Sequence, residues 1–145
     1  MELVTALAKV YGADSLVDIK SAHLSGASYK TIGDGGLKYL SDLIDGGAKV
    51  SVPSTLNPVG MDRERWKEMH ISPEFAEKQL RIIDLYGKMG IRKTCSCPPY
   101  AGPNVPGFGD HIAWAESSAL SVANSFFGAR TNREGGPGAL AAAIL

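Results

Sequence analysis

Apolar and polar positions along the chain follow two kinds of spacing, one typical of a helix and one typical of a strand. Helical spacing of apolar residues occurs in three stretches, at residues 1–11, about 34–44 and 73–89, and the small residues at 110–128 indicate a fourth helix. Shorter β-type runs lie between them, at residues 16–20, 50–52 and 91–96. Because these runs and helices alternate, with polar loops between them, the sequence predicts an α/β fold whose mostly parallel sheet is flanked by helices. We expect residues 1–145 to form a single such domain.

The helix expected at residues 73–89 has the clearest local signals. Ser72 can cap its first turn, and Pro73 fits its first helical position. Apolar residues at turn spacing, Leu80 among them, form a stripe that is expected to face the core. Gly90 ends the helix.

Two stretches near the end of the chain are unusual in composition. Residues 110–128 are mostly small, and small residues let neighbouring backbones approach closely, so we expect a buried, crowded helix. Residues 139–145 are an apolar helix start with no cap and no polar face, whereas chain ends are usually polar and frayed. Either this segment packs into a core, or the chain is an incomplete portion of a larger fold.

Composition narrows the class of protein. The chain has 15 basic and 15 acidic residues and a formal net charge of zero, so no overall field attracts nucleic acid or an anionic membrane. Any anionic ligand must therefore be held locally. There is no run of eighteen apolar residues and no signal-peptide layout, which favours the cytoplasm.

Both cysteines lie in the segment 94–100, which opens the least regular part of the sequence. Cys95 and Cys97 are followed by Pro98 and Pro99, so neither a helix nor a central strand can continue. We expect this segment to be held rigidly at the end of the preceding strand, where α/β folds place their chemistry. The two thiols face a common site or act as small buried apolar groups, and composition favours neither. A zinc or iron–sulfur site usually takes four protein ligands, so this pair would need ligands from elsewhere.

Two polar loops follow predicted strands and are candidate ligand sites. They are Ser25-Gly26-Ala27-Ser28 and Thr55-Leu56-Asn57-Pro58. Backbone N–H groups and short side chains in such loops can converge on a carboxylate or a phosphate. Either loop alone is better explained as an ordinary turn. Two such loops in the same place after successive strands favour a site.

Charged residues in the second half of the chain give further candidates. Glu116 lies among small residues, and we expect it to be buried, where it would transfer a proton or bind a substrate hydroxyl. The alternative for Glu116 is a surface ion pair. Arg130 and Arg133 either hold an anion or pin their loop to Glu134, with equal support. His70 lies in a surface-like run and is assigned no role.

Long motifs of the chain resemble the large subunit of the aconitase X family, and the resemblance covers nearly the whole sequence. The motifs are Ser21 to Asp34, Thr55 to Asp62, Thr94 to Tyr100, Gly109 to Ser118, Ala123 to Ser125 and Gly128 to Gly135. Members of this family are iron–sulfur dehydratases related to aconitase. The branch that the sequence most resembles removes water from (R)-5-phosphomevalonate to give trans-anhydromevalonate 5-phosphate in a mevalonate pathway. A sister branch dehydrates cis-3-hydroxy-L-proline.

The resemblance implies roles for particular residues. Cys97 matches a ligand position of an iron–sulfur cluster, expected to be 4Fe–4S, and Cys95 is an incidental neighbour. Glu116 and Ser117 are the candidate catalytic residues. Positions that bind the substrate are matched by Gly26, Ala27, Ser28, Asn57, Pro58 and Ser118. In this chemistry an open iron acts on the departing hydroxyl, and a base removes a proton from the carbon beside the carboxylate.

The family pattern extends beyond this chain. Large subunits of the family are much longer, carry their other cluster cysteines past the position of Leu145, and work with a small swivelling subunit. We therefore expect a component of a hydro-lyase that acts on a small anionic hydroxy acid and whose remaining cluster ligands lie outside this chain. The alternatives are the hydroxyproline enzyme and a truncated, non-catalytic fragment.

Overall fold

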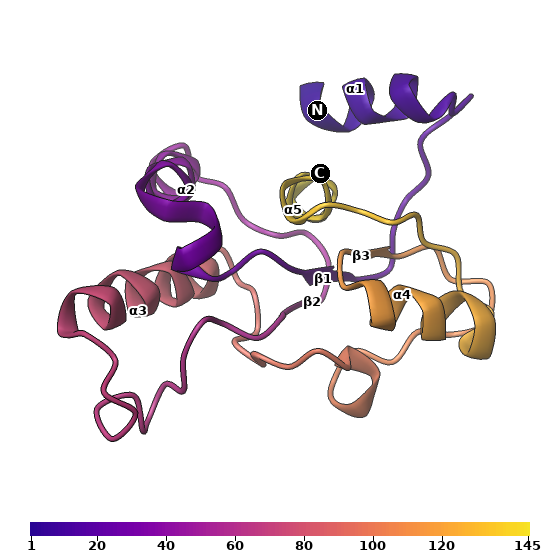
Figure 1. Cartoon of the computed structure of the whole chain (residues 1–145). Coiled ribbons are helices and arrows are strands. Elements are labelled where there is room, and N and C mark those ends of the chain that lie inside the picture. Colours follow the sequence, from indigo (N-terminus) through magenta and orange to yellow (C-terminus); the bar gives the residue numbers. More distant parts are fainter.

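A computed structural model describes residues 1–145, and a small parallel sheet lies at its centre (Figure 1). The three strands are β1 (Ala22–Leu24), β2 (Ser54–Leu56) and β3 (Ala113–Trp114). Their order in the sheet is β2-β1-β3, and both neighbouring pairs are parallel. The predicted α/β fold, a mostly parallel sheet flanked by helices, is therefore confirmed.

Five α-helices and two short helical turns surround this sheet. They are α1 (Glu2–Tyr11), α2 (Tyr29–Asp45), α3 (Pro73–Lys88), α4 (Ser117–Val122) and α5 (Gly136–Ile144), with a 3-10 turn η1 (Pro99–Ala101) and a π-helical turn η2 (Ala123–Phe127). Helix α5 lies between α1 and the sheet, while α2 and α3 pack against each other (Figure 1). None of these helices combines the length and the apolar character needed to cross a membrane.

Side chains that alternate along the strands divide the interior into two cores. Leu24 and Leu56 point into the larger core, which α2, α3 and α5 complete. Trp114 points to the opposite face and packs on Ala119 and Ala123 in the smaller core. Because both faces of the sheet are covered, the strands are buried along their whole length.

The strands lie a few residues away from the runs predicted at 16–20 and 50–52. Apolar and polar residues alternate within the run 16–20 as in a half-buried strand, but the run forms no strand, and the Leu16 and Val17 side chains are 51% and 57% exposed. The observed strands are buried on both faces, so apolar and polar residues do not alternate regularly along them. The run 91–96 is likewise not a strand and makes a single bridge, between Arg92 and Thr55.

The long helix predicted at residues 110–128 is wrong in its first part. Ala113 and Trp114 form β3 beside β1, and the Ala113 N–H donates to the Ser21 carbonyl over 3.0 Å. The helix begins only at Ser117 and continues through η2. Its small residues are buried on the side that meets Trp114, as at Ala119, and exposed on the other.

Helix α3 begins as predicted. The Ser72 hydroxyl accepts a hydrogen bond from the Phe75 N–H over 3.3 Å, and Pro73 occupies the first helical position. The apolar stripe faces the core with one exception: Leu80 is 40% exposed, while the neighbouring Gln79 is fully buried. A polar residue thus replaces a predicted apolar one on the buried side.

Helices α2 and α5 both begin earlier than predicted. The first turn of α2 is joined to the rest of the helix across a kink at Gly33, whose φ of 57° suits glycine. Helix α5 begins at Gly136, where a side chain would lie 2.5 Å from the Ser25 carbonyl oxygen. Its Leu140 is buried in the larger core. This apolar end of the chain therefore packs into the core.

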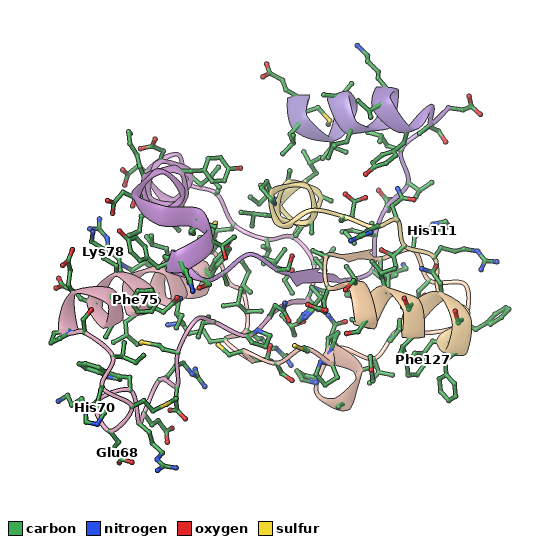
Figure 2. The ribbon with its side chains drawn as sticks, in the orientation of Figure 1. Glu68, His70, Phe75, Lys78, His111 and Phe127 are labelled. Carbon is green, nitrogen blue, oxygen red and sulfur yellow. The ribbon has the colours of Figure 1, made fainter.

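Side-chain contacts near the surface join the first turn of α2 to α3. The Tyr29 ring meets the Phe75 ring edge to face, with centroids 5.8 Å apart, and the Lys78 ammonium donates to the Tyr29 hydroxyl over 2.8 Å. Phe75 and Lys78 lie on α3, whereas His70 lies farther out, in the segment that precedes this helix (Figure 2). His70 is therefore remote from the sheet and its polar loops.

Candidate active site

The carboxyl ends of the three strands meet at one edge of the sheet, because the strands are parallel. The Asn57 N–H, just beyond β2, donates to the Leu24 carbonyl over 2.8 Å, and the Ala115 N–H, just beyond β3, donates to the His23 carbonyl over 2.9 Å. The Asn57 side chain spans the end of the central strand, since its Nδ2 donates to Glu116 Oε2 over 2.7 Å. This hydrogen bond joins two of the predicted site residues.

Glu116 precedes the first turn of α4 and is partly exposed, so the prediction that it is buried is wrong. Its Oε1 accepts from the Ser118 N–H over 3.4 Å and from the Ser118 hydroxyl over 3.2 Å, while the Ser117 hydroxyl lies 3.5 Å away. Partial burial raises the pKa of Glu116, but the hydrogen bonds from Asn57 and Ser118 outweigh it and hold the pKa below its usual range. Glu116 is therefore ionised at neutral pH.

Gln79 on α3 ties the loop after β1 to the loop after β2. Its buried side chain donates through Nε2 to the Ala27 carbonyl over 2.8 Å, and its Oε1 accepts from the N–H groups of Tyr29 (2.8 Å) and Gly60 (3.3 Å). Gly60 lies so close to the Ser28 hydroxyl that a side chain there would collide with it. The two predicted loops are thus brought together by a residue that the sequence does not single out.

We expect Gln79→Leu to lower the free energy of unfolding by about 3 kcal/mol, because backbone groups of both loops lose their partners in a buried place. Denaturant unfolding of the purified chain measures the loss. Glu77→Gln, on the exposed side of the same helix, is the matched control and should change stability by less than about 0.5 kcal/mol. Equal stabilities for the two variants would contradict the role given to Gln79.

The loop between β1 and α2 has unpaired backbone donors. The N–H groups of Ser25, Gly26, Ala27 and Ser28 donate no hydrogen bond within the protein. Gly26 has a φ of 71°, a left-handed conformation that glycine adopts without strain. Successive free N–H groups at the start of a helix are suited to an anion. The predicted substrate residues Gly26, Ala27 and Ser28 therefore lie in a donor-rich loop.

The cysteine segment runs beside the end of β2. The Thr94 hydroxyl accepts from the Leu56 N–H over 3.1 Å and donates to the Leu56 carbonyl over 2.9 Å, and the Ser96 N–H donates to the same carbonyl. These bonds hold the segment at the carboxyl edge of the sheet. Cys97 is exposed, whereas Cys95 is half-buried against the larger core, and this burial raises the pKa of its thiol.

Residues 1–145 do not make a metal site by themselves. No group of three or more His, Cys, Asp or Glu side chains is close enough together to hold an ion. Cys97 is the exposed one of two free thiols. Because an iron–sulfur cluster is held by several thiolates, Cys97 fits as one ligand of a site that other residues complete, not as a whole site.

Two cavities each border one residue of the predicted substrate set. One of about 510 Å³ is lined by Gly26 together with residues of α2 and α5. A second, of about 330 Å³, is lined by Pro58, Asp62 and Cys95. Neither includes Asn57 or Glu116, so Gly26 and Pro58 border spaces separate from the hydrogen-bonded pair.

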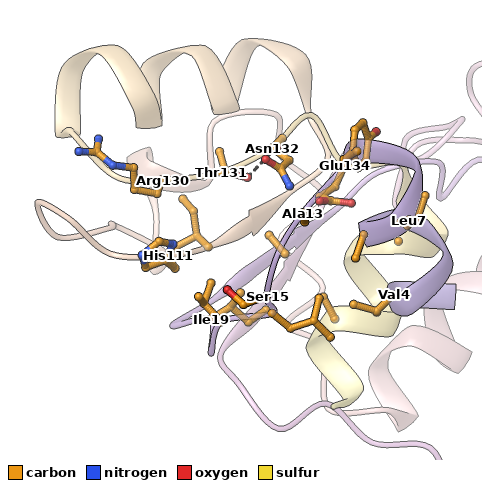
Figure 3. Close-up of a pocket in the computed structure, with 18 of the residues that line it drawn as sticks. Val4, Leu7, Ala13, Ser15, Ile19, His111, Arg130, Thr131, Asn132 and Glu134 are labelled. Carbon is orange, nitrogen blue, oxygen red and sulfur yellow. Dashed lines mark hydrogen bonds between the residues drawn. The ribbon is translucent and has the colours of Figure 1, made fainter. Parts of the chain in front are cut away.

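A third cavity, of about 380 Å³, lies beside α1 and contains none of the predicted catalytic, substrate or metal residues (Figure 3). Arg130 and Glu134 both line it, with the Thr131 hydroxyl donating to the Asn132 carbonyl between them. Neither Arg130 nor Arg133 forms an ion pair with Glu134. The alternative in which these arginines pin the loop to Glu134 is therefore not observed.

His23 lies within β1 and is fully buried. Its Nδ1 is 2.8 Å from Thr55 Oγ1, which also accepts from Asn104 Nδ2 over 3.0 Å. Burial lowers the pKa of His23 to about 4, although nearby Asn57 and Glu116 act to raise it, so the ring is neutral at neutral pH. Sequence reasoning missed this group, for which the available signal is a histidine between two apolar residues, Ala22 and Leu24.

We expect acid to destabilise the protein through His23. Its pKa is about 4 in the folded chain and about 6.5 when unfolded, so between these values the unfolded state binds more protons. The free energy of unfolding should therefore be fully retained above pH 6.5 and fall by up to about 3 kcal/mol as the pH drops towards 4. Denaturant unfolding across this range measures the fall. His23→Gln cannot titrate and should flatten the slope, whereas an unchanged slope would contradict the assignment.

Comparison with known proteins finds one family that matches the whole chain. The family described as the first domain of aconitase X matches residues 1–145. The chain is 62% identical over 144 residues to a phosphomevalonate dehydratase large subunit of Methanothermobacter thermautotrophicus, a match that covers 99% of this chain and 36% of that protein. It is 38% identical over 133 residues to a cis-3-hydroxy-L-proline dehydratase of Pseudomonas aeruginosa, covering 92% of this chain and 23% of the relative.

The fold is also similar to a solved structure. The crystal structure of Thermococcus kodakaraensis aconitase X in its holo-form superimposes with a TM-score of 0.89 and 57% sequence identity, over 99% of this chain and 35% of the other. The chain therefore spans about a third of the length of these relatives. Because the family match extends over every residue, the chain belongs to the aconitase X family and corresponds to its first domain.

Proposed function

We propose that residues 1–145 form one wall of the active site of a phosphomevalonate dehydratase large subunit. The observation that carries this proposal is the 2.7 Å hydrogen bond between Asn57 and Glu116, which assembles a polar group from two strand ends. The reaction would remove water from (R)-5-phosphomevalonate to give trans-anhydromevalonate 5-phosphate. The higher identity to the large subunit of that name, 62% against 38%, supports this substrate over cis-3-hydroxy-L-proline.

The geometry suggests a role for each side chain in binding the substrate hydroxyl. The ionised Glu116 would accept a hydrogen bond from the substrate hydroxyl, and Asn57 and Ser118 hold this carboxylate in place. A carboxylate with a lowered pKa is a weak base, so its acceptor role is favoured over removal of a carbon-bound proton. Ser117, with only a 3.5 Å contact to Glu116, would contribute less than Ser118.

The anionic ends of the substrate need hydrogen-bond donors. The four free N–H groups of residues 25–28 supply them without any positive side chain, which suits a chain of zero net charge. Pro58 is exposed at the end of the second loop and would border the site without a polar contact. In this proposal the loop after β1 binds a carboxylate or phosphate, and the Asn57–Glu116 pair binds the hydroxyl.

The cofactor and the partner subunit belong to the same proposal. The name of the solved relative, a holo-form, implies a cofactor, and we assign Cys97 as one thiolate ligand of an iron–sulfur cluster, of the 4Fe–4S type. The remaining ligands would come from outside residues 1–145. The name large subunit implies a small subunit as partner. No step is assigned to the cluster, because these residues do not make its site.

Turnover of the complete assembly tests the proposal. The large subunit that contains this chain is purified without oxygen together with the small subunit, and loss of water from (R)-5-phosphomevalonate and from cis-3-hydroxy-L-proline is followed by mass spectrometry. We expect conversion of the first compound only, and no turnover by the 145-residue chain alone. Conversion of hydroxyproline alone would select the sister activity, and conversion of neither would select a non-catalytic chain.

A further inference from the structure

The hydrogen bonds around His23 determine which ring nitrogen carries its proton. Asn104 Nδ2 donates to the Ala22 carbonyl and to Thr55 Oγ1, each over 3.0 Å. The Thr55 hydroxyl therefore already accepts one hydrogen bond and must place its own proton on an acceptor. Its one further partner is His23 Nδ1, 2.8 Å away. Nδ1 thus accepts, and in a neutral imidazole the proton is then on Nε2.

The orientation of the Asn57 amide is fixed in the same way. Its Nδ2 donates to Glu116 Oε2 over 2.7 Å, and the flipped amide would set two acceptor oxygens against each other. Asn57 Oδ1 must therefore be the buried end of the amide. It accepts nothing, and His23 Nε2 is the one other buried side-chain polar atom without a partner.

The two unpaired atoms are complementary. His23 Nε2 carries a proton and needs an acceptor, while Asn57 Oδ1 is an acceptor and needs a donor. His23 is paired with Thr55 in the sheet, and Asn57 follows two residues later on the same side of the extended chain. The nearby Asn57 side chain also acts to raise the pKa of the ring, as an acceptor close to an N–H does.

We infer that His23 is a positioning residue: its neutral ring donates from Nε2 to Asn57 Oδ1 and holds the Asn57 amide with its NH₂ group directed at the Glu116 carboxylate. The hydrogen bonds then form a continuous line from the buried Asn104 and Thr55 through His23 and Asn57 to the partly exposed carboxylate. The positioning role of His23 deepens the proposed function. Of the tests below, only the measurement of enzyme activity depends on that function.

The tautomer is tested in the unaltered chain. Long-range nitrogen–proton NMR correlations of histidine labelled with nitrogen-15 distinguish a ring protonated on Nε2 from one protonated on Nδ1. We expect His23 to show the Nε2–H pattern at pH 7, alone or within the complete assembly, with His70 and His111 as exposed references. A Nδ1–H pattern, or a doubly protonated ring, would overturn the inference whatever the enzyme's activity.

Two variants test the positioning role. His23→Leu removes the donor, whereas His23→Gln places an amide N–H near the position of Nε2 and should restore the contact with Asn57. In the complete assembly we expect His23→Leu to lower kcat by about tenfold to a hundredfold with little change in KM, and His23→Gln to recover most of the loss. A loss that His23→Gln does not relieve would indicate a packing role and overturn the inference.

A second readout separates positioning from packing. Carbon NMR titration should show a higher Glu116 pKa in His23→Leu than in the parent, because the Asn57 donor is no longer aimed at the carboxylate. Asn57→Ala should raise it at least as far. If Asn57→Ala shifts the pKa of Glu116 and a folded His23→Leu variant does not, then His23 does not position the Asn57 amide. None of these spectra requires turnover. They therefore test the role of His23 even if the assembly does not catalyse the proposed dehydration.

Discussion

Replacing Glu116 by glutamine is expected to lower the dehydration rate of the complete assembly by at least about a hundredfold. The side chain keeps its size, but the negative charge that Asn57 and Ser118 hold in place is lost. A substrate hydroxyl would then face an amide in place of a carboxylate that is ionised throughout the neutral range. Steady-state kinetics with (R)-5-phosphomevalonate measures the change, which should fall mainly on kcat.

Matched variants show whether this loss is specific to the site. Glu77→Gln makes the same chemical change on the exposed side of α3 and should leave the rate unaltered. Ser118→Ala should cost more than Ser117→Ala, because the Ser118 hydroxyl is nearer to Glu116 Oε1, at 3.2 Å against 3.5 Å. Activity of Glu116→Gln within about threefold of the parent would remove Glu116 from the chemistry.

Local signals predicted the helices better than the strands. Helix α3 follows from Ser72, Pro73 and its apolar spacing, all of which act within a few residues. The strands have only two or three residues and are covered on both faces, so they have neither the length nor the alternation that marks a strand. The run 16–20 has that alternation, yet its Leu16 and Val17 remain exposed because no neighbouring strand pairs with them.

The site was predictable as a set of loops but not as a set of contacts. Ser28 and Asn57 are candidates because polar residues that follow strands must gather at one edge of a parallel sheet. Which atoms meet there depends on distant pairings: the Asn57–Glu116 bond spans 59 residues, and the Gln79 bond to Ala27 spans 52. A helix pattern also cannot reveal that Gln79, rather than Leu80, takes the buried position. Such choices are made by packing between elements.

The cysteine pair offers the second test with a large expected effect. In the complete assembly, Cys97→Ser is expected to lose most of its iron and sulfide, its visible absorption and its dehydration activity, because a serine hydroxyl is a poor substitute for a thiolate ligand. Cys95→Ser, two positions earlier in the sequence, is the control and should retain all three. Iron and sulfide are assayed on protein prepared without oxygen.

The two cysteines differ in backbone conformation and in burial, so the two variants are expected to behave differently. Cys95 has a left-handed backbone with a φ of 49° and packs against the larger core, and burial raises its thiol pKa, so it is a poor source of thiolate. Cys97 is exposed and follows Ser96, whose N–H is hydrogen-bonded to the end of β2. A cluster whose other ligands come from outside these residues can reach Cys97 there. If Cys97→Ser retains its iron while Cys95→Ser loses it, the assignment of the ligand is reversed. If both retain it, the cluster is held without this segment, and the carboxyl edge contributes only hydrogen bonds.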